Sequence, residues 1–297
     1  MNFEDYIKKI TALKPAKEVF VAYLDILGFS DFVKGRSHDD LIAMYQSFVR
    51  TNIDYSLAEA AERILENSSW LKEMEETGNL APQFDNVTLN CITASDSIIL
   101  STSGNEFKDF MRLVVTVRNF MATSLLSGFP LRGAITQGML TLDWDSPSSG
   151  VSIVHHQMLG LPLVEASNLE KQQNWSGCVI HQNVINKIGP KIIRLEPSMI
   201  AMYDVPVKNK NNEPIYKSMP VVNWVFIIEK SEIDEEKIRL AFSAHGKEVT
   251  ASVETKINNT IKFYKKMSSH PVYQNKMSHE DWWSFMEKEL KAKFMNE

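Results

Sequence analysis

Two aspartates, Asp25 and Asp96, each lie within an apolar stretch that has the composition of a β-strand. Burying a lone carboxylate is unfavourable unless a cation or hydrogen-bond donors compensate its charge. One such group at the end of a strand and another at a hairpin are typical of a divalent-cation site, because Mg²⁺ or Mn²⁺ on a phosphate needs only one or two protein carboxylates. The spacing also allows a structural alternative, in which Asp25 caps a turn and Asp96 occupies a hairpin turn.

Arg132 is a third residue of chemical interest, because its charge lies inside a predicted strand. A buried guanidinium needs a partner, which is either a carboxylate or a phosphate group. The sequence leaves both roles open, and we favour phosphate contact or support of the site.

The elements that must position these groups follow from the apolar pattern. Residues 18–27 predict a buried strand that ends at Gly28, with Ser30 capping a helix that begins near Asp31. An amphipathic helix is predicted after residue 40, and residues 56–76 continue as a helix with a weaker apolar stripe. Further elements are predicted as strands at 87–92 and 97–101, a helix at 107–121, strands at 131–140 and 151–155 with a turn-rich loop between them, and a helix at 163–172.

The order strand, helix, strand, strand, helix, strand is that of the ferredoxin-like plan, in which helices back an antiparallel sheet. We therefore predict an α+β fold with this core in residues 1–194. Residues 195–297 are predicted to form a C-terminal α/β extension, packed on the core or following it. Its elements are a strand at 221–228, a helix with an apolar stripe from Val249 to Tyr264, and a helix that opens at Ser278.

Composition restricts the class of protein. The chain has 297 residues, 44% of them hydrophobic, and a formal net charge of −5 without a long basic run. We therefore expect a globular protein that does not bind nucleic acid. No apolar stretch approaches the ~20 residues of a transmembrane helix, and the first residues lack a signal pattern, so we expect no membrane insertion and a cytoplasmic location.

Three segments, in this order, resemble the catalytic domain of class III nucleotidyl cyclases, over roughly residues 18–180. They are Tyr23-Leu-Asp25-Ile-Leu-Gly28-Phe29-Ser30, Ser95-Asp96-Ser97 and Leu131-Arg132-Gly-Ala-Ile-Thr-Gln-Gly138.

The resemblance implies a ferredoxin-like core and two Mg²⁺ or Mn²⁺ ions per site, held at Asp25, Ile26 and Asp96. These ions would bind a nucleoside triphosphate and activate its ribose 3′-hydroxyl. The backbone from Ile26 through Gly28 and Phe29 to Ser30 would bind the phosphates, and it leads into a predicted helix N-terminus, where anions are stabilised.

The departures from the family pattern fall among the residues that read the base, orient the ribose and stabilise the transition state. Ile92 stands where purine-selective members have a lysine, and Gln157 where they have the base-reading aspartate. Val164 and Asn168 stand where the family has an asparagine and an arginine that orient the ribose and stabilise the transition state. The metal half is therefore intact, whereas the purine and transition-state half is not.

This pattern resembles the pyrimidine cyclases of the bacterial anti-phage system Pycsar, most visibly in residues 160–170. The resemblance implies cyclisation of UTP, or less favourably CTP, with Arg132, Gln157 and Asn168 on the substrate. A cyclic-nucleotide-sensing effector would then read the product. Tyr45 is a candidate aromatic wall for the base, although it could equally pack within its helix stripe. Class III sites are completed between two subunits, which implies a head-to-tail homodimer with sites at the interface.

Three alternatives stay open. The chain could cyclise a purine nucleotide, ATP or GTP, or it could be an inactive homologue that only binds nucleotide or a partner. It could also be another metal-dependent enzyme on a ferredoxin-like fold, such as a polymerase palm. The absence of a GG-[DE]-[DE]-F run argues against a diguanylate cyclase.

Overall fold

The computed structural model describes residues 15–53, 55–56, 89–144, 156–189, 197–209, 215–227 and 233–274, together with residues 276 and 281. Its centre is an eight-stranded sheet with the strand order β2-β3-β1-β4-β6-β8-β7, and β5 pairs with β4 away from this path. None of the described helices is both long and apolar enough to cross a lipid bilayer.

The first four strands confirm the ferredoxin-like α+β plan. Their order in the sheet is β2-β3-β1-β4, and every neighbouring pair is antiparallel. Short helices follow β1, and the long helix α6 connects β3 to β4, as in a split βαβ arrangement. The elements are β1 (Lys17–Ile26), α2 (Phe29–Val33), α3 (His38–Tyr45), a π-helical turn (Gln46–Arg50), β2 (Leu89–Ala94), β3 (Ser97–Thr102), α6 (Phe107–Leu126) and β4 (Leu131–Trp144).

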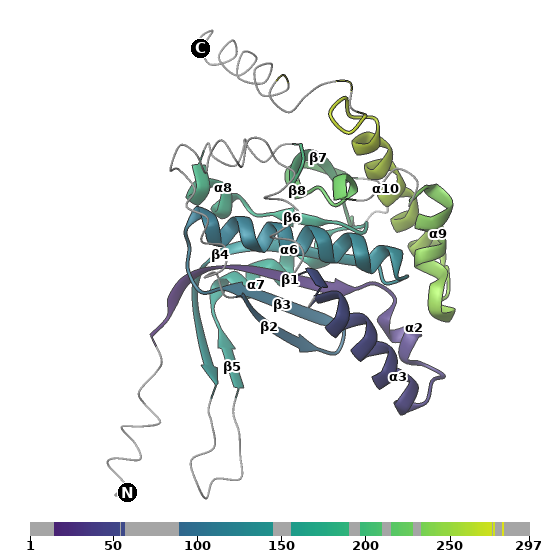
Figure 1. Cartoon of the computed structure of the whole chain (residues 1–297), viewed down its shortest axis with the longest axis horizontal. Coiled ribbons are helices and arrows are strands. Elements are labelled where there is room, and N and C mark those ends of the chain that lie inside the picture. Colours follow the sequence, from purple (N-terminus) through teal and green to yellow (C-terminus); the bar gives the residue numbers. More distant parts are fainter. Residues whose placement is uncertain are drawn as a thin grey trace, which may run out of the picture.

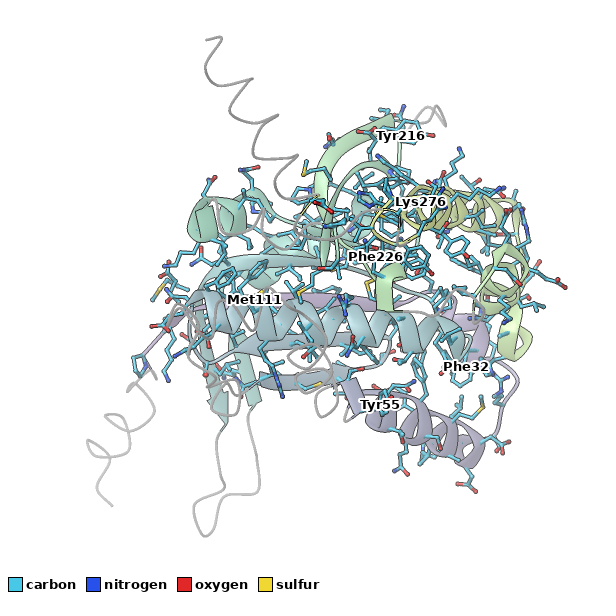
Figure 2. All side chains as sticks on the ribbon, turned by 45° about the horizontal axis from the view of Figure 1, so that its top comes forward. Phe32, Tyr55, Met111, Tyr216, Phe226 and Lys276 are labelled. Atoms are coloured by element: carbon cyan, nitrogen blue, oxygen red, sulfur yellow. The ribbon has the colours of Figure 1, made fainter. Side chains whose placement is uncertain are left out.

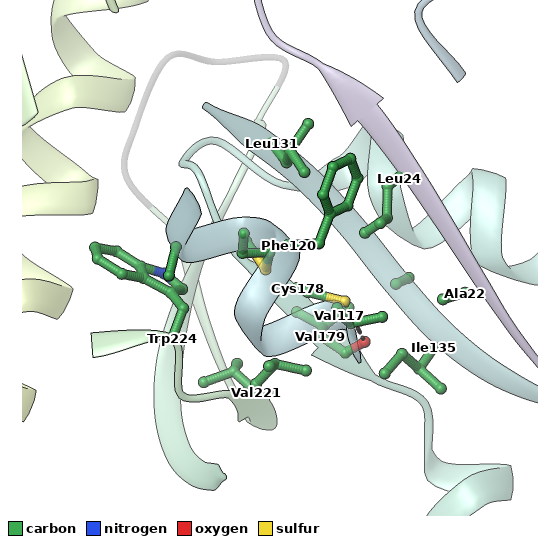
Figure 3. Close-up of a cluster of buried hydrophobic side chains, with 14 of the residues drawn as sticks. Ala22, Leu24, Val117, Phe120, Leu131, Ile135, Cys178, Val179, Val221 and Trp224 are labelled. Atoms are coloured by element: carbon green, nitrogen blue, oxygen red, sulfur yellow. Dashed lines mark hydrogen bonds between the residues drawn. The ribbon is translucent and has the colours of Figure 1, made fainter. Parts of the chain in front are cut away.

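The sheet buries its two faces against different helices. Successive side chains of β1 point to opposite faces of the sheet. On one face, the ring of Phe20 packs against that of Phe110 of α6, with ring centroids 5.3 Å apart. Figure 3 shows Phe120 of the same helix beside Leu24 and Leu131. Val19 and Val21 point the other way and form a smaller cluster with side chains of β4 and of α7 (Leu161–Gln172). Helix α6 therefore covers one face of the sheet (Figure 1), and α7 covers the other.

The C-terminal part of the chain extends the same sheet. Strand β6 (Cys178–Ile180) runs parallel to β4 and pairs with β8 (Ile215–Val222), which pairs with β7 (Ile200–Val207). The predicted division at residue 194 remains a prediction. The remaining described helices are α8 (Gln182–Ile188), α9 (Glu235–Ser243), α10 (Ala251–Ser268) and the 3-10 turns Val225–Ile227 and Ala244–Gly246.

Two expected strand ends are corrected here. Strand β4 continues to Trp144 instead of ending at residue 140, because its second half pairs with β5 (His156–Leu159). The strand expected at 221–228 ends at Val222. Asn223 accounts for this end, since its side chain donates to Pro197 O at 2.5 Å and accepts from Val225 N at 3.3 Å, which turns the backbone.

Helix α9 was not expected, whereas the stripe from Val249 to Tyr264 correctly predicted α10. The strand predicted at 151–155 lies outside the described residues, as do nearly all of the helix predicted at 56–76 and of the helix predicted from Ser278.

Candidate active site

The sheet brings Asp25 and Asp96 together. Asp25 is the second-last residue of β1 and pairs in register with Ser97, the first residue of β3. Asp96 lies in the two-residue turn that joins β2 to β3, and Ser95 adopts the left-handed conformation (φ 59°) that such tight hairpins require. The Asp96 carbonyl accepts a hydrogen bond from Ile26 N at 3.0 Å, which fastens the turn to the end of β1.

The Asp25 carboxyl is held in an environment that disfavours its charge. Burial, the negative charge of Glu170, and the charge and hydrogen bond of Asp96 raise its pKa to about 7, although Arg132 acts in the opposite direction. A divalent cation would relieve this repulsion between carboxylates, and carboxylate oxygens are the ligands that Mg²⁺ and Mn²⁺ prefer. The residues present therefore fit a cation at Asp25 and Asp96.

Within the described part of the chain, no group of three or more His, Cys, Asp or Glu residues is arranged to hold a metal ion. Asp25 and Asp96 offer two carboxylates. Mg²⁺ that binds a phosphate group is commonly held by one or two protein carboxylates. Ile26 has an apolar, buried side chain, and its amide is bonded to Asp96. Its contribution to a metal site could come only from its carbonyl oxygen.

Arg132 links the first carboxylate to helix α7. Its Nη2 atom lies 3.4 Å from Asp25 Oδ2, and its guanidinium also forms a close ion pair with Glu170. Nη1 donates to Gln173 O at 3.3 Å. The side chain of Arg132 is 9% exposed and that of Glu170 is 2% exposed. The structure thus favours the carboxylate-pairing alternative for Arg132, which makes it a positioning residue for Asp25.

Glu170 was missed as a site residue from the sequence. It is the last buried position of α7, four residues after the buried Ala166 and eight after the buried Pro162. Positions four apart lie on one helix face. A glutamate on the buried face of a helix was the signal that could have revealed it.

The turn after β1 offers fewer free amides than expected. Ile26 N donates to Asp96 O and Leu27 N to Pro130 O, so both amides are engaged. The amides of Gly28, Phe29 and Ser30 have no backbone acceptor among the described residues, and they open α2, a helix of five residues. Gly28 has φ +79°, and a Cβ atom there would lie 2.7 Å from the Cδ atom of Lys247. The turn therefore requires glycine for its backbone and for this contact.

Residues from the C-terminal part pack against this turn and against α2. Lys247 Nζ donates to Gly128 O at 2.6 Å and to Ala241 O at 3.0 Å. The ring of His245 lies 6.1 Å from that of Phe32, the buried residue of α2 that Figure 2 labels.

Tyr45 lies at the end of α3 and is half-buried. Its ring meets the ring of Phe29 edge-on, with centroids 6.4 Å apart. Tyr45 therefore packs against Phe29, and this contact also places its ring beside the turn after β1. Its contact with a base remains a prediction.

Gln157 is not brought to Asp25 within one chain. Gln157 is an exposed residue of β5 that pairs with Asp143, whereas Asp25 pairs with Arg132 at the other end of β4. The eleven steps between Arg132 and Asp143 span roughly 35 Å of extended strand. Asn168 is exposed on α7. A single chain thus separates Asp25 from Gln157, the expected base-reading residue.

No protein-family model matches the chain, and no curated protein matches it in sequence. Among solved structures, it is similar to the guanylyl cyclase Cya2, with 9% identity, a TM-score of 0.43, and coverage of 71% of this chain and 92% of that one. It is also similar to the guanylate cyclase domain of RhGC from Catenaria anguillulae in complex with GTP, with 13% identity, a TM-score of 0.42, and coverage of 71% and 98%. The adenylyl cyclase CyaB from P. aeruginosa shows 14% identity, a TM-score of 0.40, and coverage of 74% and 98%. At such low identities and TM-scores, the similarity carries no conclusion about substrate or reaction.

Proposed function

We propose that this chain is a class III nucleotide cyclase, which converts a nucleoside triphosphate to the 3′,5′-cyclic nucleotide and pyrophosphate. The observation that carries the proposal is the meeting of Asp25 and Asp96 at one edge of a ferredoxin-like sheet, beside the left-handed turn at Gly28. In the reaction, the ribose 3′-oxygen forms a bond to the α-phosphorus while the bond to the bridging oxygen of pyrophosphate breaks. The hydroxyl proton passes to solvent.

Asp25 and Asp96 would hold Mg²⁺ or Mn²⁺, two ions per site. When bound, these ions lower the pKa of the attacking hydroxyl and stabilise the negative charge of the leaving group. The chain's own residues provide position. Arg132, itself fixed by Glu170, holds the Asp25 carboxylate in place, and the amides of residues 28–30 can donate to phosphate oxygens.

For the base we propose a pyrimidine, with UTP favoured over CTP. Ile92 and Gln157 lack the charges that would read a purine edge, and an amide can present either its donor or its acceptor to a pyrimidine. Neither Ile92 nor Gln157 has a carboxylate that could accept a hydrogen bond from the amino group of cytosine, and this favours UTP. Tyr45 is the proposed aromatic wall. The cyclic product would then be read by a sensing effector in anti-phage defence, a proposal supported by the resemblance of residues 160–170 to pyrimidine cyclases.

We further propose a head-to-tail homodimer, because the chain keeps Gln157 far from its own Asp25. Several large apolar side chains are exposed on β4, β5 and α7, of which β5 carries Gln157 and α7 carries Asn168, and this supports a second copy there. We call them the β4–α7 patch: Met139 (54% exposed), Leu159 (71%), Leu161 (67%) and Val164 (55%). In such a dimer, each metal half would meet the base-reading half of the other subunit.

The test is incubation of the full chain with each of ATP, GTP, CTP and UTP and with Mn²⁺, followed by identification of products by mass. The proposal expects cyclic UMP as the main product. Faster cyclisation of ATP or GTP would replace the pyrimidine assignment with a purine one. Absence of any cyclic product would favour an inactive nucleotide-binding homologue.

A further inference from the structure

A pair of hydroxyl groups lies on the same face of the sheet as the Asp25 carboxyl. Along β1, Tyr23 comes two residues before Asp25, so the two side chains point to one face. The Tyr23 hydroxyl lies 2.6 Å from Ser97 Oγ on β3, and both residues are half-buried. Among the described residues, this contact is the one hydrogen bond that either hydroxyl makes.

The strand register places the hydroxyl pair beside both aspartates. Ser97 directly follows Asp96 and pairs with Asp25 across β1 and β3. The neighbouring amide, Ile26 N, donates to Asp96 O. The Asp25–Ser97 pair is therefore of the non-hydrogen-bonded kind, in which Cα atoms lie about 4.5 Å apart and side chains approach most closely. Tyr23 lies one pleat further back on β1, so its ring must lean toward the end that carries both aspartates to reach Ser97.

The hydroxyl pair can make further hydrogen bonds. Tyrosine and serine hydroxyls each carry one hydrogen and can also accept. Whichever of the two donates within the 2.6 Å contact, the hydrogen of the other remains available, together with acceptor lone pairs. A neutral group that both donates and accepts is matched by another hydroxyl. The chemistry of the pair therefore suits a sugar hydroxyl.

The proposed reaction determines which sugar hydroxyl would reach the pair. The attacking 3′-oxygen must lie near Asp25 and Asp96, so the ribose lies against this end of the sheet. The 2′-hydroxyl is on the adjacent carbon of the ring and shares that position. On the β4 side of Asp25, the guanidinium of Arg132 is already paired with Glu170. On the β3 side, the neighbouring polar side chains are the two hydroxyls.

We propose that Tyr23 and Ser97 bind the 2′-hydroxyl of the substrate ribose and so select ribonucleotides over 2′-deoxyribonucleotides. The assignment rests on the proposed function, because it names how the sugar of that substrate is recognised. A site that hydrogen-bonds a substrate hydroxyl rejects the analogue that lacks it, since polar groups of the protein then lose a partner. The selection concerns the sugar alone and is independent of which base is bound.

The test compares ribonucleotides with their 2′-deoxy analogues, using the full chain and Mn²⁺. UTP is compared with 2′-deoxyUTP and ATP with 2′-deoxyATP, because each analogue keeps the 3′-hydroxyl that the reaction needs. Both kcat/KM and the dissociation constant, from titration calorimetry, are measured. The parent chain should prefer the ribonucleotide about tenfold, the effect of one hydrogen bond between neutral groups.

Two variants remove the hydroxyls one at a time. Tyr23→Phe, which keeps the ring, and Ser97→Ala should each lose most of the preference, because they weaken the reaction of the ribonucleotide and leave that of the 2′-deoxy analogue unchanged. Tyr216→Phe, at an exposed tyrosine of β8, is the control and should keep the preference. Melting temperatures verify that the variants fold, and either variant alone is sufficient for the comparison.

The inference would be overturned by a parent chain that treats a ribonucleotide and its 2′-deoxy analogue alike. It would also be overturned by variants that keep the preference, or that lose activity and affinity equally with both nucleotides, since the hydroxyls would then serve only to join β1 to β3. The outcome is separable from that of the proposed function. If no triphosphate is cyclised, the cyclase proposal fails, and the dissociation constants decide the present inference. Cyclisation without a sugar preference would refute only the present inference.

Discussion

Arg132 on β4 and Glu170 on α7 form a buried ion pair, and the guanidinium of Arg132 also contacts the carboxylate of Asp25. Removing one partner of a buried pair leaves an uncompensated charge, whereas an intact pair keeps both groups in one geometry. The pair therefore ties the position of the Asp25 carboxylate to the packing of α7 on the sheet.

Glu170→Gln should destabilise the chain by about 3 kcal/mol, because Arg132 would keep its charge in a buried site with a weaker partner. The free energy of unfolding, measured by denaturant titration, tests this expectation. Glu248→Gln, at an exposed glutamate, is the control and should change stability by less than about 0.5 kcal/mol. Equal stabilities of the two variants would show that the Arg132–Glu170 pair contributes nothing specific.

Asp25→Asn and Asp96→Asn should each abolish cyclisation while preserving the fold, since an amide retains the shape of the carboxyl but binds divalent cations poorly. The measurements are product formation with Mn²⁺ and the shift of the melting temperature on adding Mn²⁺. The parent chain should be stabilised by the ion and both variants should not be. Near-parental turnover in either variant would contradict the metal assignment.

In a metal-free buffer with chelator, the stability contributed by Asp25 should fall as pH rises. The folded chain raises the pKa of this group from 3.8 to about 7, so the folded state holds the proton more tightly than the unfolded chain. The contribution is fully present below about pH 4 and is lost as pH rises to about 7. Relative to Asp25→Asn, the parent chain should lose about 2 kcal/mol over this interval, a value reduced for partial exposure. A difference that does not vary with pH would contradict the raised pKa.

The dimer predicts complementation. Asp25→Asn lacks the metal half, and a Gln157→Ala, Asn168→Ala double variant lacks the base-reading half. Mixed together, they should regain up to about a quarter of parental activity, because half of the randomly mixed dimers have one intact site of two. Leu161→Glu in the β4–α7 patch should abolish this recovery and yield a monomer by light scattering. Full activity of that monomer would exclude a shared site.

Tyr45→Ala should reduce the preference for pyrimidines over purines, because base stacking on an aromatic ring contributes about 1–3 kcal/mol. Tyr45→Phe retains the ring and should retain the preference. The ratio of kcat/KM for UTP and ATP measures the effect, and melting temperatures verify that the contact with Phe29 is dispensable for folding. An unchanged ratio in Tyr45→Ala would assign Tyr45 to packing alone.

The sequence predicted that Asp25 and Asp96 lie on neighbouring strands because the signals for both are local, and their role as metal ligands stays a prediction. The apolar run of β1 and the hairpin around Asp96 are visible as patterns of consecutive residues, and their pairing follows from the ferredoxin-like order. Glu170 was not found, because its ion pair with Arg132 spans 38 residues and depends on how α7 lies on the sheet. Helix α9 has only three buried residues, Ile238, Ala241 and Phe242, too short a stripe to stand out.

The length of β4 was underestimated for a related reason. Asp143 resembles a turn residue in sequence, yet it continues the strand because β5 supplies a pairing partner. This extension is also what carries Gln157 away from Asp25. The separation of the two halves of the site was therefore invisible until the tertiary pairing was known.

The contact of Lys247 with Gly28 has a consequence for the order in which the protein is made. A ribosome releases β1 and the turn at Gly28 before Lys247, which lies 219 residues later in the sequence. Because domains fold as their chain is released, the turn would lack this support until Lys247 has emerged. A chain cut between these two residues would keep Asp25 but lose the side chain that packs on the turn beside it.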